Sequence, residues 1–139
     1  MIVGAPMKVY CDSTILIYFL DSIGPFHEKA KAKLEKLHSV SARLVFSDLT
    51  RLECRVGPLK RNDAERLARF DAFFALSTVL KAGLGADVFD KAAEIRAHQG
   101  IKTADSLHLA AAMSCGCDLF LTNDLALEKV QGIKVEIME

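Results

Sequence analysis

Two aspartates follow strand-like runs, where parallel α/β proteins place their active sites. Asp12 comes directly after Val-Tyr-Cys, and Asp124 comes after Leu-Phe-Leu-Thr-Asn. In open parallel sheets, ligands bind beyond the carboxyl ends of the strands. An aspartate at such a position also caps the helix that follows, so either residue alone is explained equally well by helix capping.

Two further acids lie inside predicted helices. Asp105 is in the first turn of a helix that Thr103 is expected to cap, and the rest of that helix is nearly all apolar. An acid at the end of a buried helix must face a cleft or be paired, although the helix dipole alone also favours a carboxylate there. Glu53 lies in an otherwise apolar stretch, and its alternative role is an ion pair with Arg51 or Arg55.

A cluster of these carboxylates needs a counter-charge. Two carboxylates about 4 Å apart repel each other by roughly 4 kcal/mol at an intermediate dielectric. Ligand sets made of oxygen select hard ions such as Mg²⁺ or Mn²⁺, and acid clusters that hold these ions are typical of phosphoryl-transfer enzymes. If the helices start at the carboxyl edge of the sheet, all four acids point to one metal-binding cleft.

Short apolar runs alternate with amphipathic runs along the chain. The expected strands are residues 7–11, 44–46, 78–80, 118–121 and 134–137, the last at a sheet edge. The expected helices begin near residues 14, 25, 48, 63, 86 and 103. This alternation predicts an α/β fold with a mainly parallel sheet covered on both faces. Residues 1–6 are interpreted as an extension, and residues 7–139 as a single domain.

Charge and hydropathy restrict the possible partners. The 18 lysines and arginines balance the 18 acidic residues, so only a local patch can argue for nucleic acid. Residues 51–69 hold six basic residues against three acidic ones, a patch that suits either RNA binding or an ordinary solvated helix. The chain has neither an apolar run long enough to span a membrane nor a signal peptide, which favours a cytoplasmic protein. The residues proposed to contact RNA are Arg51, Arg55, Lys60 and Arg61.

The runs around the four acids resemble the motifs of the PIN-domain family, and within it the VapC-like toxin ribonucleases of toxin–antitoxin pairs. Order and spacing agree from residue 7 to about residue 137. One mild departure is Thr14, where asparagine or serine is common. The four runs are VYCDSTILIY (9–18), SDLTRLE (47–53), TADSLHLAA (103–111) and LTND (121–124).

The resemblance implies a three-layer α/β/α fold and an endoribonuclease that uses Mg²⁺ or Mn²⁺ to cut single-stranded RNA. Asp12, Asp105 and Asp124 would be the metal ligands, and Glu53 would orient the attacking water or reach a metal through water. It also implies products with 5′-phosphate and 3′-hydroxyl ends, a homodimer, and a small antitoxin that obstructs the active site. Two hydroxyls, those of Thr14 and Thr122, would steady the acids.

Two other features favour more than one interpretation. His108 lies one turn after Asp105, and a packed histidine is favoured over one that contacts the acids. The apolar residues of two predicted helices exceed what one small core needs, so part of them is expected at an interface. These residues are Ile15, Leu16, Ile17, Phe19, Leu20, Phe70, Phe73 and Phe74.

Three rival functions fit the sequence less well. A receiver domain needs paired acids after the first strand and a phospho-accepting aspartate after the middle strand, but Ser-Thr follows Asp12 and Lys-Ala-Gly follows Leu80. A haloacid-dehalogenase-type phosphatase needs Asp-x-Asp, and position 14 is threonine. A catalytically inactive PIN-like binding module would keep the fold and lose acids, whereas all four acids are present here.

Overall fold

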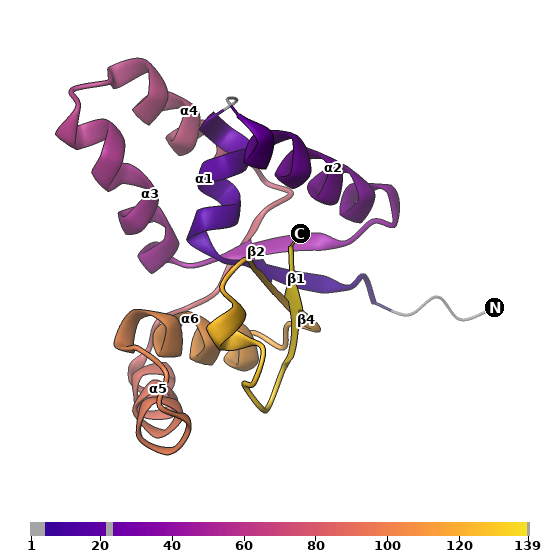
Figure 1. The fold of residues 1–139 in the computed structure, drawn as a ribbon, viewed down its shortest axis with the longest axis vertical. Helices are drawn as coiled ribbons and strands as arrows, with labels where there is room; N and C mark the ends of the chain where they lie inside the picture. Colours follow the sequence, from indigo (N-terminus) through magenta and orange to yellow (C-terminus); the bar gives the residue numbers. More distant parts are fainter. Residues whose placement is uncertain (1–4, 22–23, 139) are drawn as a thin grey trace.

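A central sheet lies between two layers of helices in the computed structural model, which describes residues 5–21 and 24–138 (Figure 1). Most of the predicted N-terminal extension, residues 1–4, lies outside the described part of the chain. All strand pairings are parallel, which confirms the predicted α/β class. The strands are β1 (Lys8–Cys11), β2 (Arg43–Phe46), β3 (Leu80–Lys81), β4 (Leu119–Thr122) and β5 (Lys134–Ile137).

The strand order is β3-β2-β1-β4-β5. The chain places β2 and β3 successively on one side of β1 and then returns to place β4 and β5 on the other side. The order therefore reverses between β1 and β4, and this switch point is where open α/β sheets bind ligands. The last strand, β5, lies at an edge of the sheet as predicted.

The helices cover both faces of the sheet and complete the predicted three-layer α/β/α architecture. Figure 1 shows α1 to α4 on one side of the strands and α5 and α6 on the other. A short 3-10 turn, η1, follows β4. The bounds are α1 (Ser13–Asp21), α2 (Pro25–Ser39), α3 (Asp48–Lys60), α4 (Ala64–Phe74), α5 (Ala86–Gln99), α6 (Thr103–Ser114) and η1 (Leu125–Leu127).

Side chains of the central strands alternate between the two helical layers. Val9 and Cys11 pack into the apolar cluster that contains residues of α1, α2 and α4. Tyr10, between them, packs into the second cluster, with residues of α5 and α6. This period of two follows from the pleat of a strand. Because helices cover both faces, all four residues of β4 are buried.

Several predicted boundaries are corrected by the structure; β4, for example, is Leu119–Thr122 rather than 118–121. The first helix begins at Ser13 rather than at residue 14. The N-cap of α6 is Lys102, and Thr103 is already the first helical residue. The third strand is shifted to 80–81, because the carbonyls of Ser77 and Thr78 accept hydrogen bonds from the Arg43 guanidinium instead of joining the sheet.

The apolar residues of α1 and α4 mostly fill the core. Ile15, Leu16 and Phe70 are at most 1% exposed, whereas Ile17 and Phe19 are only partly buried. The number of apolar residues in α1 and α4, which seemed more than one small core needs, is explained largely by the contact of α1 with its neighbouring helices. Within residues 5–21 and 24–138, no helix combines the length and the apolar character that crossing a membrane requires.

Candidate active site

The fold brings all four predicted acids to the carboxyl edge of the sheet. Asp12 directly follows β1, and Asp124 lies two residues beyond the end of β4, so the two flank the switch point. Helix α6 ends at the opposite edge, where the Lys8 ammonium donates to the carbonyl of Cys115 (3.1 Å). Twelve helical residues span roughly 18 Å, which returns Asp105 to the carboxyl edge.

The carboxylates at this edge act on one another electrostatically. Burial is the main cause that raises the pKa of Asp105, and the negative charges of Asp12 and Asp124 raise it further. Burial also raises the pKa of Asp12, which is 8% exposed, and this effect outweighs the hydrogen bond from Thr122. These shifts have the direction expected for acids crowded together in a partly dry cleft.

Thr122 connects the two aspartates at the switch point. Its hydroxyl donates to Oδ2 of Asp12 (2.7 Å) and accepts from the backbone N–H of Asp124 (3.1 Å). The other oxygen of Asp12, Oδ1, accepts from the backbone N–H of Ser13 (2.8 Å). Asp124 also caps η1, because its Oδ1 accepts from the N–H of Ala126 (2.9 Å). Helix capping and a place beside the other acids therefore coexist at Asp124.

Replacing Thr122 by valine is expected to destabilise the protein by about 1–3 kcal/mol, because the buried Asp12 carboxylate loses a donor and the Asp124 N–H loses an acceptor. Thermal and urea unfolding at neutral pH measure this cost. The matched control is Thr14→Val, since the Thr14 side chain makes no hydrogen bond among those of the described residues. An equal loss in both variants would contradict the role given to Thr122.

Glu53 is held by two donors that come from other helices. Its Oε1 accepts from the hydroxyl of Ser13 (2.7 Å) and lies 2.5 Å from Nε2 of His108. Burial alone would raise the pKa of Glu53, but the hydrogen bonds from His108 and Ser13 outweigh burial and lower it. The predicted alternative, an ion pair with Arg51 or Arg55, does not form, since these arginines pair with other residues.

Two residues of this network were underrated from the sequence. His108 is buried, as a packed histidine should be, but it also contacts Glu53. Ser13, rather than the predicted Thr14, supplies the α1 hydroxyl to the acids. The sequence feature that indicated a role for His108 is its position as a polar side chain inside the apolar run of α6, one turn after Asp105.

Comparison with known proteins identifies the fold. The family model described as PIN domain matches residues 9–133, which is most of the chain. The chain belongs to the PIN-domain family. No curated protein sequence matches it.

Several solved structures similar to this chain in fold are of toxin–antitoxin systems. VapBC2 of Rickettsia felis, bound to a promoter DNA fragment, superposes with a TM-score of 0.77 at 18% identity, covering 96% of this chain and 100% of that chain. DNA-bound VapBC of Salmonella typhimurium has a TM-score of 0.75 at 21% identity, covering 96% and 99%. VapC20 of Mycobacterium tuberculosis, a sarcin-ricin loop cleaving toxin, has a TM-score of 0.66 at 15% identity, covering 81% and 86%.

The donor chemistry of this PIN domain suits a hard divalent cation. The three aspartates offer oxygen ligands only, and a cation would relieve the repulsion that contributes to the raised pKa of Asp105. As placed, however, the described residues contain no group of three or more His, Cys, Asp or Glu side chains arranged to hold a metal ion. Metal ligation by Asp12, Asp105 and Asp124 therefore rests on their chemistry and common edge.

The basic residues predicted to contact RNA differ in their surroundings. Arg51 lies 3.7 Å from Asp48, and Arg55 makes two hydrogen bonds to Asp71, so carboxylates offset both charges. Lys60 and Arg61, exposed at the end of α3, make no ion pair among the described residues. Lys60 lies seven residues beyond Glu53, roughly 10 Å along the helix axis.

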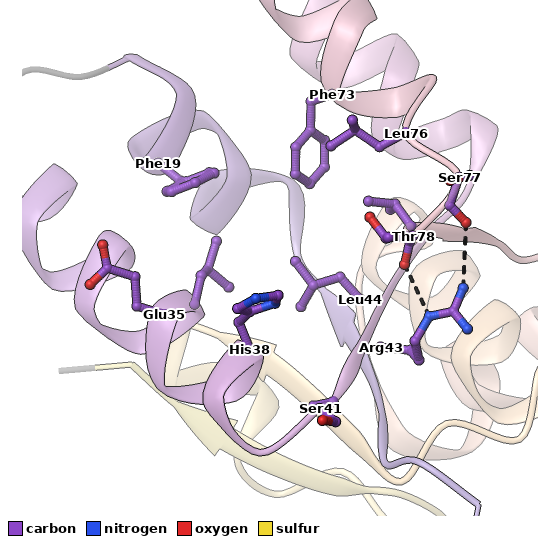
Figure 2. A pocket seen from close by; sticks show the side chains of 13 residues that line it. Phe19, Glu35, His38, Ser41, Arg43, Leu44, Phe73, Leu76, Ser77 and Thr78 are labelled. Carbon is purple, nitrogen blue, oxygen red and sulfur yellow. Dashed lines mark hydrogen bonds between the residues drawn. The ribbon is translucent and has the colours of Figure 1, made fainter.

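An apolar cavity of about 820 Å³ lies apart from the acids. Figure 2 shows Phe19 of α1, His38 of α2 and Phe73 of α4 around it, with Arg43 at the start of β2 hydrogen-bonded to the segment after α4. None of the four acids lines this cavity. In this PIN domain, the largely apolar hollow and the polar cluster are therefore separate features.

Proposed function

We propose that this PIN domain is a metal-dependent endoribonuclease that hydrolyses phosphodiester bonds of single-stranded RNA, as the toxin of a toxin–antitoxin pair. The observation that carries the proposal is the meeting of four acids at the switch point of the sheet. Asp12, Asp105 and Asp124 act on one another electrostatically there, and Glu53 is held ionised by its hydrogen bonds. VapC20, a relative by fold, is described as a sarcin-ricin loop cleaving toxin.

Asp12, Asp105 and Asp124 would hold Mg²⁺ or Mn²⁺. Such an ion, when bound, lowers the pKa of a water and stabilises charge on the phosphate. The protein's own residues orient the acids: hydrogen bonds from the Ser13 N–H and the Thr122 hydroxyl hold the two oxygens of Asp12. Glu53 accepts its hydrogen bonds through Oε1, which leaves Oε2 to orient a water and accept its proton. A general base must be ionised and within reach in this way.

RNA cleavage by the purified protein in Mn²⁺ or Mg²⁺ tests the proposal. We expect a 5′-labelled single-stranded RNA to yield fragments with 3′-hydroxyl ends and new 5′-phosphates, and DNA of the same sequence serves as the substrate control. Asp12→Asn, purified identically, shows whether a contaminant is responsible. A protein that binds RNA without cutting it in either cation would instead support the inactive binding module.

We also propose a homodimer and a small antitoxin as partners. Support for the antitoxin comes from the relatives by fold, since the Rickettsia felis and Salmonella typhimurium structures are of VapBC. The apolar cavity lined by Phe19 and Phe73 offers a surface that the RNA chemistry does not use. Light scattering at micromolar concentration tests the dimer, and co-purification with the product of the adjacent reading frame tests the antitoxin.

A further inference from the structure

His108 is a buried polar ring in the neighbourhood of the acids. It is 1% exposed, and both of its nitrogens have partners. Nε2 lies 2.5 Å from Oε1 of Glu53, and Nδ1 lies 2.8 Å from the hydroxyl of Tyr10. The three residues come from α3, α6 and β1, so one hydrogen-bonded chain connects β1 with a helix from each layer.

The partners of His108 decide where its protons are. An ionised carboxylate only accepts hydrogen bonds, so the nitrogen facing Glu53 must carry a proton. The Ser13 hydroxyl donates to the same Oε1, and no hydrogen bond among the described residues involves Oε2. One oxygen of Glu53 is therefore anchored twice, and the other is left for the reaction.

Tyr10 holds the far side of the imidazole. Its ring stacks on Phe120 with a centroid distance of 5.4 Å and an interplanar angle of 8°, and its side chain is fully buried. Its hydroxyl also lies 2.8 Å from Oγ of Ser47, the N-cap of the helix that carries Glu53, and 3.4 Å from Oγ1 of Thr50 in the first turn of that helix. The same tyrosine thus contacts the start of α3 and the ring that holds Glu53.

We infer that His108 is a positioning residue for Glu53: its Nε2–H anchors Oε1, Tyr10 fixes the ring through Nδ1, and Oε2 is thereby aimed into the acid cluster. This inference rests on the proposed nuclease function and adds to it a residue outside the four acids. His108 itself touches neither substrate nor metal. Partners that orient a reactive group commonly change activity by roughly 10–100-fold when removed.

Steady-state kinetics of RNA cleavage separate positioning from packing. His108→Leu keeps an apolar side chain of similar size and is expected to lower kcat by roughly 10–100-fold with little change in KM. His108→Gln places an amide N–H where Nε2 was and is expected to recover much of the lost kcat. His98→Leu, at an exposed position of α5, is the matched control and should cleave like the wild type.

Two measurements independent of cleavage complete the test. Nitrogen-15 NMR of the imidazole is expected to show a protonated Nε2 in the cation-free protein. Calorimetry with Mn²⁺ is expected to give the same affinity for His108→Leu as for the wild type, because neither His108 nor Glu53 is assigned as a ligand.

Tyr10→Phe, which keeps the ring stacking, is a milder variant and should lower kcat without changing Mn²⁺ affinity.

The outcomes distinguish this inference from the proposed function. A wild type that cleaves RNA beside a fully active His108→Leu overturns the positioning role and leaves the nuclease proposal standing. An unprotonated Nε2, or loss of Mn²⁺ binding in His108→Leu, also overturns it. A wild type without cleavage but with a protonated Nε2 contradicts the nuclease proposal and retains the anchoring of Glu53 by His108.

Discussion

Asp105→Asn is expected to leave a folded protein that cleaves RNA roughly 10²–10³-fold more slowly, the size of effect seen when one charge-stabilising contact is lost from a transition state. Asparagine has nearly the same shape as aspartate, so the start of α6 should pack unchanged. The substitution removes one negative charge from the acid cluster and with it a proposed metal ligand. Rates in Mn²⁺ for the variant and the wild type give the ratio directly.

The stability of Asp105→Asn should differ from the wild type in a pH-dependent way. Because the pKa of Asp105 is raised in the folded state, the folded wild type binds more protons than the unfolded chain just above the ordinary value of 3.8. The folded wild type therefore loses stability as Asp105 ionises, when the pH rises through the raised pKa. Melts in EDTA should show the variant equal to the wild type at acid pH and slightly more stable at neutral pH.

A purely structural Asp105 predicts the opposite pattern. Loss of its interaction with the helix dipole would destabilise the protein by roughly 0.3–1 kcal/mol while cleavage stayed near normal. Asp90→Asn, at an exposed position of α5, is the matched control, and both its melting temperature and its cleavage rate should equal those of the wild type. A destabilised but active Asp105→Asn would remove Asp105 from the site.

Removal of divalent cations is expected to abolish cleavage and to lower the melting temperature. The acids at the carboxyl edge repel one another without a counter-charge, and a ligand that binds only the folded state stabilises it by about 2.7 kcal/mol at 100 times its Kd. Cleavage assays with EDTA and with added Mn²⁺ measure the first effect, and melts over a Mn²⁺ titration measure the second.

Asp105→Asn is also the control for the prediction that Mn²⁺ raises the melting temperature. If Asp105 is a ligand, the variant should show a smaller rise in melting temperature over the same Mn²⁺ titration. Equal cleavage in EDTA and in Mn²⁺ would contradict metal dependence. If cleavage needs Mn²⁺ but the melting temperature of the protein does not change over the Mn²⁺ titration, the cation binds to the RNA instead.

The strand order decides against one rival function. A receiver domain has the flavodoxin-like order 2-1-3-4-5, whereas this sheet has the order 3-2-1-4-5. Both folds place acids at the carboxyl edge of a parallel sheet, so the position of Asp12 alone does not separate them. The order and the match to the PIN-domain family exclude the receiver, while the inactive binding module is left to the cleavage experiment.

The sequence alone determined the class of fold and the edge at which the acids lie. Both follow from local patterns: short apolar strands alternate with amphipathic helices, and Asp12 and Asp124 come within two residues of the ends of two of those strands. Short-range patterns were less reliable where a side chain competes with the sheet, as Arg43 does for the carbonyls that shift β3. The start of α1 was likewise displaced by one residue.

Only the tertiary structure decided which side chains hold the acids. Glu53 and His108 are 55 positions apart, and Tyr10 and His108 are 98 apart, so no local pattern links them. Arg51 and Arg55 are the nearest basic residues to Glu53 in the sequence, yet they pair with Asp48 and Asp71. Periodicity specifies which face of a helix is buried, but the neighbour of a polar group depends on how α3 and α6 meet across the sheet.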